Sequence, residues 1–230
     1  MEQLYVLIAD DSEFMRVAYK RILESQPGLR VVAMATNGEE ATRMAEETAP
    51  DVAILDVWMP KVDGIQAAHD IRKQNPETAI VVISSYEDLN LVADLMQNGV
   101  ERKAYLLKQS ISNITDLVNI VHAVHQGQTI LDSSIVQRMA SLFCKHSAAL
   151  GTDLNGSEQD VLGLMAEGHD DSRICETLHL EPAQLAACSV SLYAKLGIFD
   201  LTASQRRSTA VQTFVGQIHK VPLSGTYAVG

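Results

Sequence analysis

The sequence predicts an α/β fold, a doubly wound five-stranded parallel sheet, followed by a small all-α domain of four helices. Three observations predict it. Over the first 126 residues, short and nearly continuous apolar segments alternate with segments long enough for crossover helices. Strands buried on both faces of a parallel sheet show this uniform apolarity. Beyond residue 127 only helical periodicity is found, and a small polar stretch at 146–158 separates the two parts.

Each predicted strand of the sheet is followed by a helix. The strand sequences are LYVLIA, VVAMA, VAILD, AIVVIS and AYLL, at residues 4–9, 31–35, 52–56, 79–84 and 104–107. The predicted helices cover roughly residues 13–25, 38–49, 64–74, 87–97 and 112–126. Boundary residues agree, because Asn37 can cap the second helix and Asn98-Gly99 can close the fourth. Right-handed crossovers then place helices on both faces of the sheet.

The chain after residue 127 is predicted to be helical. An amphipathic helix at 134–146 carries four apolar residues on one side: Ile135, Met139, Leu142 and Phe143. Further helices are predicted at 158–167, 172–179 and 182–196, with a last one within 202–220. The predicted domains are therefore residues 1–126, a linker with an amphipathic helix at 127–153, and residues 154–230.

Composition restricts the class of protein. With 230 residues, 47% of them hydrophobic, the chain can bury one large core or two ordinary ones. No apolar run approaches the roughly 18 residues that a membrane helix needs, so we expect no membrane partner. The three cysteines share no metal-binding or redox spacing, which favours reduced thiols in a cytoplasm. The net charge of −11 argues mildly against a nucleic-acid partner.

Three carboxylates stand at the ends of predicted strands. Asp10 and Asp11 follow the first strand, and Asp56 closes the third. With the strand order 2-1-3-4-5, the first and third strands are neighbours, and ligands bind in the crevice at their carboxyl ends. Three crowded carboxylates are unfavourable unless a cation joins them, and oxygen ligands of this kind suit Mg²⁺.

A hydroxyl group and a lysine are expected at the same edge of the sheet. The fourth predicted strand ends in Ser84, and the fifth leads to Lys108. Together with the acids and a metal ion, these groups form a device for placing a phosphoryl group on a carboxylate, with Asp56 as the nucleophile. The metal ion and the lysine would neutralise charge on the transferring oxygens.

Four segments, IADDSEFMR, DVAILDVWMPKVDGI, VVISSYED and YLLKQS, resemble the receiver domain of two-component response regulators. The resemblance covers about residues 1–126 and implies a flavodoxin-like fold, a cognate sensor histidine kinase as partner, and no enzyme activity beyond phosphoryl chemistry on the receiver itself. It implies the phosphoacceptor Asp56, the metal ligands Asp10, Asp11, Asp56 and the Trp58 carbonyl, the switch hydroxyl of Ser84, the aromatic switch Tyr105 and the cation Lys108. The segment 98–108 departs from the family by a longer spacing before Tyr105.

Residues 154–197 resemble the helix-turn-helix output domain of the NarL/LuxR class. The resemblance rests on core and turn positions, among them Leu154, Glu158, Val161, Leu162, Gly168, Ile174, Leu178, Leu196 and Gly197. It implies a helix-turn-helix formed by 172–179 and 182–195, with Leu185, Leu192 and Leu196 buried. The receiver resemblance implies a homodimer on activation, with the contact on the face at about 87–126. The candidate DNA contacts on it are Arg173, Gln184, Ser189 and Lys195.

The charge of this predicted output domain departs from that class. Ala186 and Cys188 stand where family members usually present a lysine and a histidine. Residues 154–215 hold eight acidic and four basic side chains, a net charge of −4. Affinity for DNA comes largely from counterions that are released when lysine and arginine bind phosphates, and this domain has few such groups.

Two functions therefore stay open. One is a phosphorylation-controlled transcription regulator that binds DNA through the helix-turn-helix. The other is a phosphorylation-controlled adaptor whose acidic helix-turn-helix contacts a protein or stabilises a dimer. The last helix leaves a similar choice, because its apolar side can pack against the domain or form a dimer seam; its members are Val211, Phe214, Val215 and Ile218.

Overall fold

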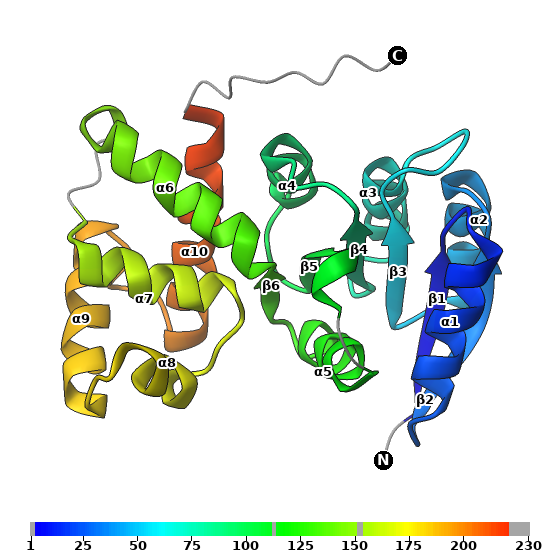
Figure 1. Ribbon diagram of the computed structural model, residues 1–230, viewed down its shortest axis with the longest axis horizontal. Coiled ribbons are helices and arrows are strands. Elements are labelled where there is room, and N and C mark those ends of the chain that lie inside the picture. The colour runs from blue at the N-terminus through cyan, green and yellow to red at the C-terminus, as the bar shows by residue number, and fades with distance from the viewer. Residues whose placement is uncertain (1–2, 112–113, 151–153, 221–230) are drawn as a thin grey trace. The chain divides into compact units, whose positions relative to one another are not determined.

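The computed structural model describes residues 3–111, 114–150 and 154–220, which are coloured in Figure 1. The side chains of 114–115, 143–150, 204 and 219–220 lie outside this description. The prediction that Phe143 lies on the apolar side of its helix therefore falls outside the described residues. The proximity of Cα atoms divides the chain into two compact units, of which the first holds Met1–Glu87 with Glu101–Asp132 and the second Asp88–Val100 with Ser133–Gly230. The predicted domain limits stay a prediction.

The first unit is built on a six-stranded parallel sheet. Its strands are β1 (Leu4–Ala9), β2 (Leu29–Ala35), β3 (Val52–Asp56), β4 (Ala79–Ser84), β5 (Lys103–Leu107) and β6 (Thr129–Leu131). Their order is β2-β1-β3-β4-β5-β6, and each neighbouring pair is parallel. The five predicted strands and their order are thereby confirmed, with β1 beside β3 at the point where the winding direction changes.

Strand β6 is an addition that the sequence prediction lacks. Its three residues, Thr129–Leu131, extend the edge of the sheet beside β5 and place Leu131 opposite Tyr105. A three-residue apolar run is too short to be distinguished by periodicity from the start of a helix. Directly after it, the carboxylate of Asp132 accepts a hydrogen bond from the Leu107 backbone N–H at 3.1 Å, which fixes the end of β6 to β5.

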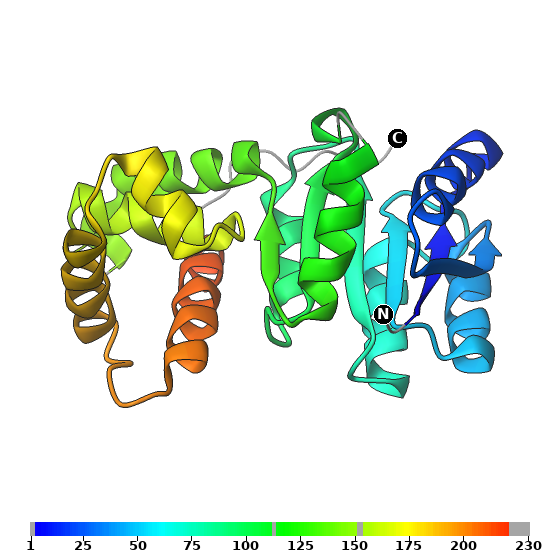
Figure 2. The same ribbon diagram turned by 90° about the horizontal axis from the view of Figure 1, so that it is seen from below.

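Helices cover both faces of this sheet, and Figure 2 shows α1 (Glu13–Glu24) and α2 (Gly38–Thr48) on opposite sides of it. Helix α5 (Ile114–His125) shares the face of α1, since Tyr19 of α1 and Leu117 of α5 belong to one core with strand side chains such as Ile54. Helix α3 (Gly64–Gln74) packs against α2. The predicted cap of α2 is confirmed, because Asn37 Oδ1 accepts the Glu40 backbone N–H at 3.0 Å.

The second unit is helical. It comprises α4 (Leu89–Met96), α6 (Ser133–Leu150), α7 (Gly156–Ala166), α8 (Asp171–Leu178), α9 (Pro182–Lys195), α10 (Ala203–Gly216) and the short 3₁₀ helix η2 (Gln217–Lys220). The predicted helix-turn-helix is confirmed as α8 and α9, and His179 ends α8 in the left-handed conformation with φ of 54°. Leu185 and Leu192 of α9 are buried as expected, whereas Leu196 is half-buried.

The structure tests two further predictions for this unit, the loop at 146–158 and the packing of the last helix. Helices α6 and α7 occupy much of the stretch 146–158 that is predicted as a loop, and residues 151–153 of it lie outside the described residues. A capping box explains the early start of α7, since Asn155 Oδ1 accepts the Glu158 N–H and the Glu158 carboxylate accepts the Asn155 N–H. The apolar side of α10 and η2 packs within the unit, because each of its four members is only 2–3% exposed: Val211, Phe214, Val215 and Ile218.

None of the helices in the described residues combines the length and the apolarity that a membrane crossing requires.

One buried cation of the sheet gives a testable pH dependence. Lys103, in β5, is 3% exposed, and burial together with the positive charge of Arg72 lowers its pKa to about 8. An unfolded lysine has a pKa of about 10.4, so between about pH 8 and pH 10.4 the unfolded chain binds more protons and stability rises with pH. Below about pH 8 the lysine is charged in the folded protein, so the whole cost of burying the cation lowers the free energy of unfolding.

We expect Lys103→Met to raise the free energy of unfolding at pH 7, by at most about 3 kcal/mol, and to lose this advantage as the pH approaches about 10.4. Urea unfolding at a series of pH values measures the effect. The matched control is Lys73→Met, at an exposed position of α3, which should show no such gain. Equal pH profiles for the two variants would contradict the prediction.

Candidate functional site

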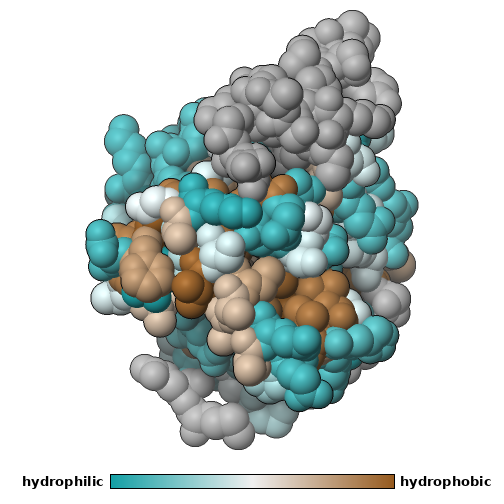
Figure 3. All heavy atoms as spheres, turned by 90° about the vertical axis from the view of Figure 1, so that its left-hand side faces the viewer, coloured by the Kyte–Doolittle hydropathy of each residue, from teal (hydrophilic) through white to brown (hydrophobic). Residues whose placement is uncertain are grey.

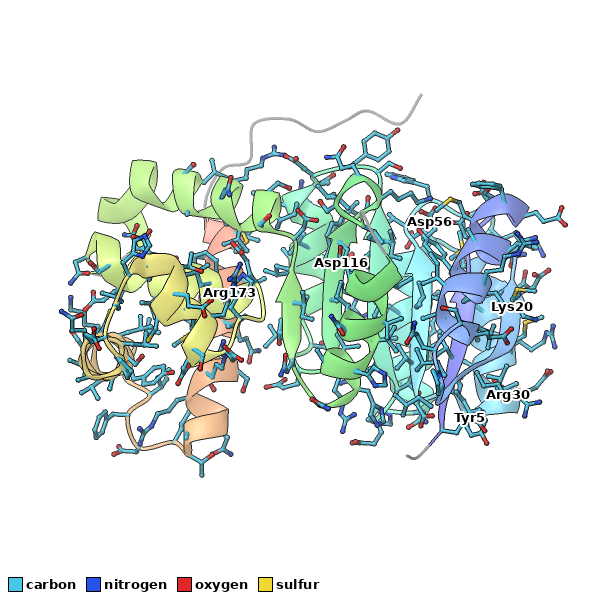
Figure 4. The ribbon with its side chains drawn as sticks, turned by 60° about the horizontal axis from the view of Figure 1, so that its bottom comes forward. Tyr5, Lys20, Arg30, Asp56, Asp116 and Arg173 are labelled. Carbon is cyan, nitrogen blue, oxygen red and sulfur yellow. The ribbon has the colours of Figure 1, made fainter. Side chains whose placement is uncertain are left out.

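Three carboxylates converge where β1 and β3 end. Asp10 and Asp11 follow β1, Asp56 is the last residue of β3, and ligand oxygens of all three lie within 4.8 Å of one another. Figure 4 shows Asp56 at this edge of the sheet, with Tyr5 and Arg30 near the opposite end. The predicted acidic cluster is therefore present, and it is formed because adjacent parallel strands bring their carboxyl ends to one edge.

Lys108 reaches into this cluster from the end of β5. It begins the 3₁₀ helix η1 (Lys108–Ser110), and its Nζ lies 2.7 Å from Asp56 Oδ1 and 3.2 Å from Asp10 Oδ2. One ammonium group thus bridges two of the three acids. Because the carboxylates are only 1% and 5% exposed, water screens these ion pairs much less than it screens pairs on the surface.

The electrostatics of the cluster follow from burial and like charge. Burial raises the pKa of Asp56, and the charges of Asp10 and Asp11 act in the same direction, while Lys108 opposes them. Burial alone would lower the pKa of Lys108, but its contacts with Asp56 and Asp10 outweigh this and raise it. Burial, and then the negative charges of Asp10 and Asp56, also raise the pKa of the Tyr19 hydroxyl. The pocket therefore favours added positive charge.

Backbone contacts fix the orientation of the acids. Asp10 Oδ1 accepts the Ser12 N–H at 2.8 Å, and the Arg16 guanidinium donates to the Asp10 and Asp11 carbonyl oxygens at 2.7 and 3.1 Å. Asp56 Oδ2 accepts the Trp58 N–H at 3.1 Å. The Asp10 and Asp56 carboxylates are thereby held before any ligand binds, which lowers the ordering cost of a bound cation.

The remaining predicted pocket residues lie on the neighbouring strands. Ser84 ends β4, is fully buried, and its Oγ accepts the Tyr86 N–H at 3.0 Å. Tyr105 in β5 is also fully buried, and its hydroxyl donates to the Tyr86 carbonyl oxygen at 3.1 Å. Trp58 is half exposed after β3. Their roles as switch hydroxyl, aromatic switch and carbonyl ligand stay predictions.

Two contacts beside the pocket are not part of the sequence prediction, namely the pairing of two aromatic rings and the close approach of Gly64 to β3. The rings of Trp58 and Tyr86 meet edge to face with centroids 6.3 Å apart, so two exposed aromatic side chains stand together beside the acids. Gly64, at the start of α3, packs directly on the acceptor strand, since an added Cβ would lie 2.0 Å from the Asp56 carbonyl oxygen. In the sequence, these contacts correspond to an aromatic residue after each of two strands and a glycine after Asp63. Both patterns are common in proteins, so neither predicts a contact with the pocket.

The donor set suits a small hard cation. Asp10, Asp11 and Asp56 offer carboxylate oxygens only, and the described residues contain no other cluster of three or more acidic, histidine or cysteine ligands. Oxygen ligands from a few carboxylates, with positions left for water and phosphate, are what Mg²⁺ requires, whereas zinc prefers nitrogen and sulfur. The chemistry of the residues thus fits the predicted magnesium ion.

Comparison with known proteins gives the family. Residues 6–122 match the response regulator receiver domain. The chain belongs to the response regulators. It is 30% identical over 200 residues to the transcriptional regulatory protein LiaR of Bacillus subtilis, with 86% of this chain and 92% of LiaR covered. This membership confirms a signalling protein rather than a catalytic enzyme.

Solved structures agree with this assignment. A two-component response regulator of the LuxR family from Aurantimonas sp. SI85-9A1 is 26% identical with a TM-score of 0.55, and the match covers 61% of this chain and 97% of that one. RcsB, in a structure of two dimers bound to two parallel DNAs, is 21% identical with a TM-score of 0.54, over 92% of this chain and 99% of RcsB. At that identity the RcsB likeness shows the fold alone.

The candidate DNA contacts of the regulator lie on α8 and α9, where three of the four are engaged within the domain. Arg173 is paired with Glu176 at 3.1 Å, and Gln184 Oε1 accepts the Glu181 N–H at 2.8 Å. Lys195 is paired at 2.8 Å with Glu158, which is 1% exposed. Ser189, in the middle of α9, is half-buried.

Glu158 is the central residue of the second unit, where the sequence prediction named it only among the core and turn positions of the resemblance. Its carboxylate accepts from Lys195 at 2.8 Å, from the Ser191 hydroxyl at 2.6 Å and from the Asn155 N–H at 2.8 Å. Burial opposes its charge, but these partners outweigh burial and lower the pKa of Glu158. A single buried carboxylate thus joins the start of α7 to the last turns of α9.

Gly64→Ala tests how closely α3 must approach the acceptor strand. We expect it to lower the free energy of unfolding by about 1–3 kcal/mol, because the new methyl group collides with the Asp56 carbonyl and forces the backbone apart. Urea unfolding followed by the fluorescence of Trp58, the only tryptophan, measures it. The control is Gly156→Ala, where nothing lies within 4 Å of the added atom. Equal stability of Gly64→Ala and wild type would refute the close contact.

Proposed function

We propose that this regulator accepts a phosphoryl group on Asp56 from a cognate sensor histidine kinase in the cytoplasm, and uses it to control its helix-turn-helix output domain in transcription. The observation that carries the proposal is the position of Lys108, whose ammonium lies 2.7 Å from the acceptor carboxylate Asp56 and 3.2 Å from Asp10. The match of residues 6–122 to the receiver domain supports it.

The chemistry assigns one role to each pocket residue. An Asp56 carboxylate oxygen forms the new bond to phosphorus while the bond from phosphorus to the donor's histidine nitrogen breaks, and the histidine leaves with the electron pair of that bond. Lys108 balances negative charge on the transferring oxygens. Asp10, Asp11 and Asp56 would hold Mg²⁺, and the Trp58 carbonyl completes the proposed ligands. When bound, the ion supplies further neutralisation of phosphoryl charge.

The response to the phosphoryl group involves β4 and β5, the next two strands on one side of β3. The new group adds a charge of about −1.5 to −2 at the sheet edge. Ser84 can then turn its hydroxyl from the Tyr86 N–H toward the phosphoryl oxygens, and Tyr105 packs behind it. The family resemblance adds a homodimer on activation. The phosphoryl group stabilises whichever arrangement of these residues binds it better.

Phosphoryl uptake tests the proposal directly. We expect the full chain to take up radioactive label from acetyl phosphate in the presence of Mg²⁺, and Asp56→Asn to reduce the uptake to background because no carboxylate remains to form the acyl phosphate. Chelation of the metal with EDTA should have the same effect. The control is Asp70→Asn, a change of the same chemistry on α3 outside the pocket. Labelling of Asp56→Asn at the wild-type rate would sink the assignment.

Control of transcription through DNA binding has the relatives on its side. LiaR is a transcriptional regulatory protein, and RcsB has the same fold and is seen on DNA. The regulator offers at most five basic side chains in its output domain, residues 154–230, so few counterions are released for each protomer.

We therefore expect a gel shift of genomic fragments by the phosphorylated regulator whose salt dependence is shallow. With at most five phosphate contacts for each protomer, the slope of log K against log salt should not exceed about 4.5 in magnitude for each protomer. The measurement is a titration across salt with and without acetyl phosphate, with Asp56→Asn as the unphosphorylated control. Absence of a salt-sensitive shift on any fragment would remove DNA from the proposal.

A second candidate, an adaptor that binds protein, is favoured by a specific observation. Each basic side chain of α8–α10 has a partner in its own domain. Arg173 pairs with Glu176, Lys195 with the buried Glu158 and Arg207 with Asp171, while Arg206 donates to the Leu201 carbonyl and lies over the Phe199 ring. The exposed pairs are easily exchanged for phosphate, but removal of Lys195 would leave a buried carboxylate without its cation.

A further inference from the structure

Helix α9 exposes a face that is apolar throughout. Five residues, which we call the α9 face, are exposed at helical spacing: Ala183, Ala186, Ala187, Val190 and Ala194. Residues three and four positions apart are neighbours on a helix, so they form one stripe. Val190, in its middle, is 50% exposed, while Leu185 and Leu192 on the other side of the helix are buried. In the second unit a whole helix is therefore presented to solvent by its apolar side.

The α9 face has the form of a docking surface for another helix. Figure 3, which looks onto the side of the molecule that carries α9 in Figure 1, shows hydrophobic residues at the surface with hydrophilic ones around them. Alanine side chains let two helix axes approach to about 8–10 Å, and a valine supplies a central knob. An amphipathic partner helix recognised through anchors at every third and fourth position fits such a surface.

The surroundings of the α9 face are acidic. The exposed acids within residues 154–215 are Asp160, Asp170, Asp171, Glu176, Glu181 and Asp200. Glu181 is the N-cap residue of α9. Helix α8 packs against α9 and carries Asp171 and Glu176. Two of these acids, Asp171 and Glu176, are paired with Arg207 and Arg173, and the remaining acids leave the rim net negative, so it attracts cations and repels phosphates.

We propose that the α9 face docks a partner protein that presents a basic amphipathic helix, with its apolar stripe on Ala183, Ala187 and Val190 and its lysines or arginines toward the acidic rim. The inference rests on the adaptor form of the proposed function. Charge complementarity selects this occupant. A second copy would bring acids against acids, since residues 154–215 carry a net charge of −4, and DNA would meet the same repulsion.

A designed peptide tests the proposal without knowledge of the natural partner. The probe is a fluorescein-labelled amphipathic helix of leucine and lysine, titrated with the full-length regulator and followed by fluorescence anisotropy. The same peptide with glutamate in place of lysine is the charge control. We expect the lysine peptide to bind, the glutamate peptide not to bind, and Val190→Asn to weaken the lysine peptide about tenfold, because a buried apolar contact becomes a polar one.

Matched variants separate the α9 face from general attraction to an acidic protein. Ser157→Asn places the same new residue at an exposed position of α7 and should bind the peptide as wild type does. Ala187→Gln should weaken binding as Val190→Asn does, because a longer side chain keeps the two helices apart; both positions are exposed, and circular dichroism checks that the fold is retained. Equal peptide affinity for Val190→Asn, Ala187→Gln and wild type overturns the proposal.

Two other occupants are outcomes of the same experiment. Self-association of wild type that Val190→Asn abolishes, measured by sedimentation, would assign the face to a second copy and overturn the proposal. A DNA shift that Val190→Asn abolishes would assign it to DNA, with the same consequence. Labelling of Asp56 is measured on each variant in parallel. Absence of labelling in the wild-type regulator refutes the proposed phosphoryl function. Absence of peptide binding by a wild-type regulator that is labelled normally refutes the docking inference alone.

Discussion

The structure of the receiver pocket depends on one cation held between two buried carboxylates. Asp10 and Asp56 are brought together by the parallel pairing of β1 and β3, and their charges would repel strongly in a region that water hardly reaches. The ammonium group of Lys108 relieves this repulsion from the end of β5, two strands beyond β3. The order of strands, the close approach of Gly64 and the fixed carboxylate orientations all serve this juxtaposition, which also prepares the pocket for a phosphoryl group and a metal ion.

In the output domain, too, a buried carboxylate is paired with a lysine, and this pairing affects which side chains remain on the surface of α9. Glu158 is buried at the start of α7 and needs a cation, and Lys195 of α9 supplies it. The pairing stabilises the helical domain, but it removes from α9 the single lysine that the helix carries. Once that group is committed inward, the outward face of α9 is left with alanines and a valine. The requirement of a buried charge for a partner thus determines which chemistry remains for recognition.

The sequence predicts what periodicity and strand ends encode. Five strands, their order and the convergence of Asp10, Asp11 and Asp56 follow from apolar runs that end in acids, because parallel strands must share an edge. Strand β6 is too short to have a period, and an apolar run gives no signal for the burial of Lys103 at the start of β5. The pairing of Glu158 with Lys195 joins residues 37 positions apart, and no local pattern records such a contact.

Tyr105 is already buried in the structure, so phosphorylation is not needed to bury its ring. Its ring is fully buried and its hydroxyl is bonded to the Tyr86 carbonyl, so packing and this hydrogen bond stabilise the inward position by themselves. A phosphoryl group shifts an equilibrium only by as much as it binds one arrangement better than the other. In the proposed phosphorylated form, the differential contacts would then come chiefly from Ser84, which would exchange the Tyr86 N–H for a phosphoryl oxygen, and from Lys108, which would move from Asp10 toward the phosphoryl group. Movement of the Tyr86 segment follows from the first exchange, because both Ser84 and Tyr105 are bonded to its backbone.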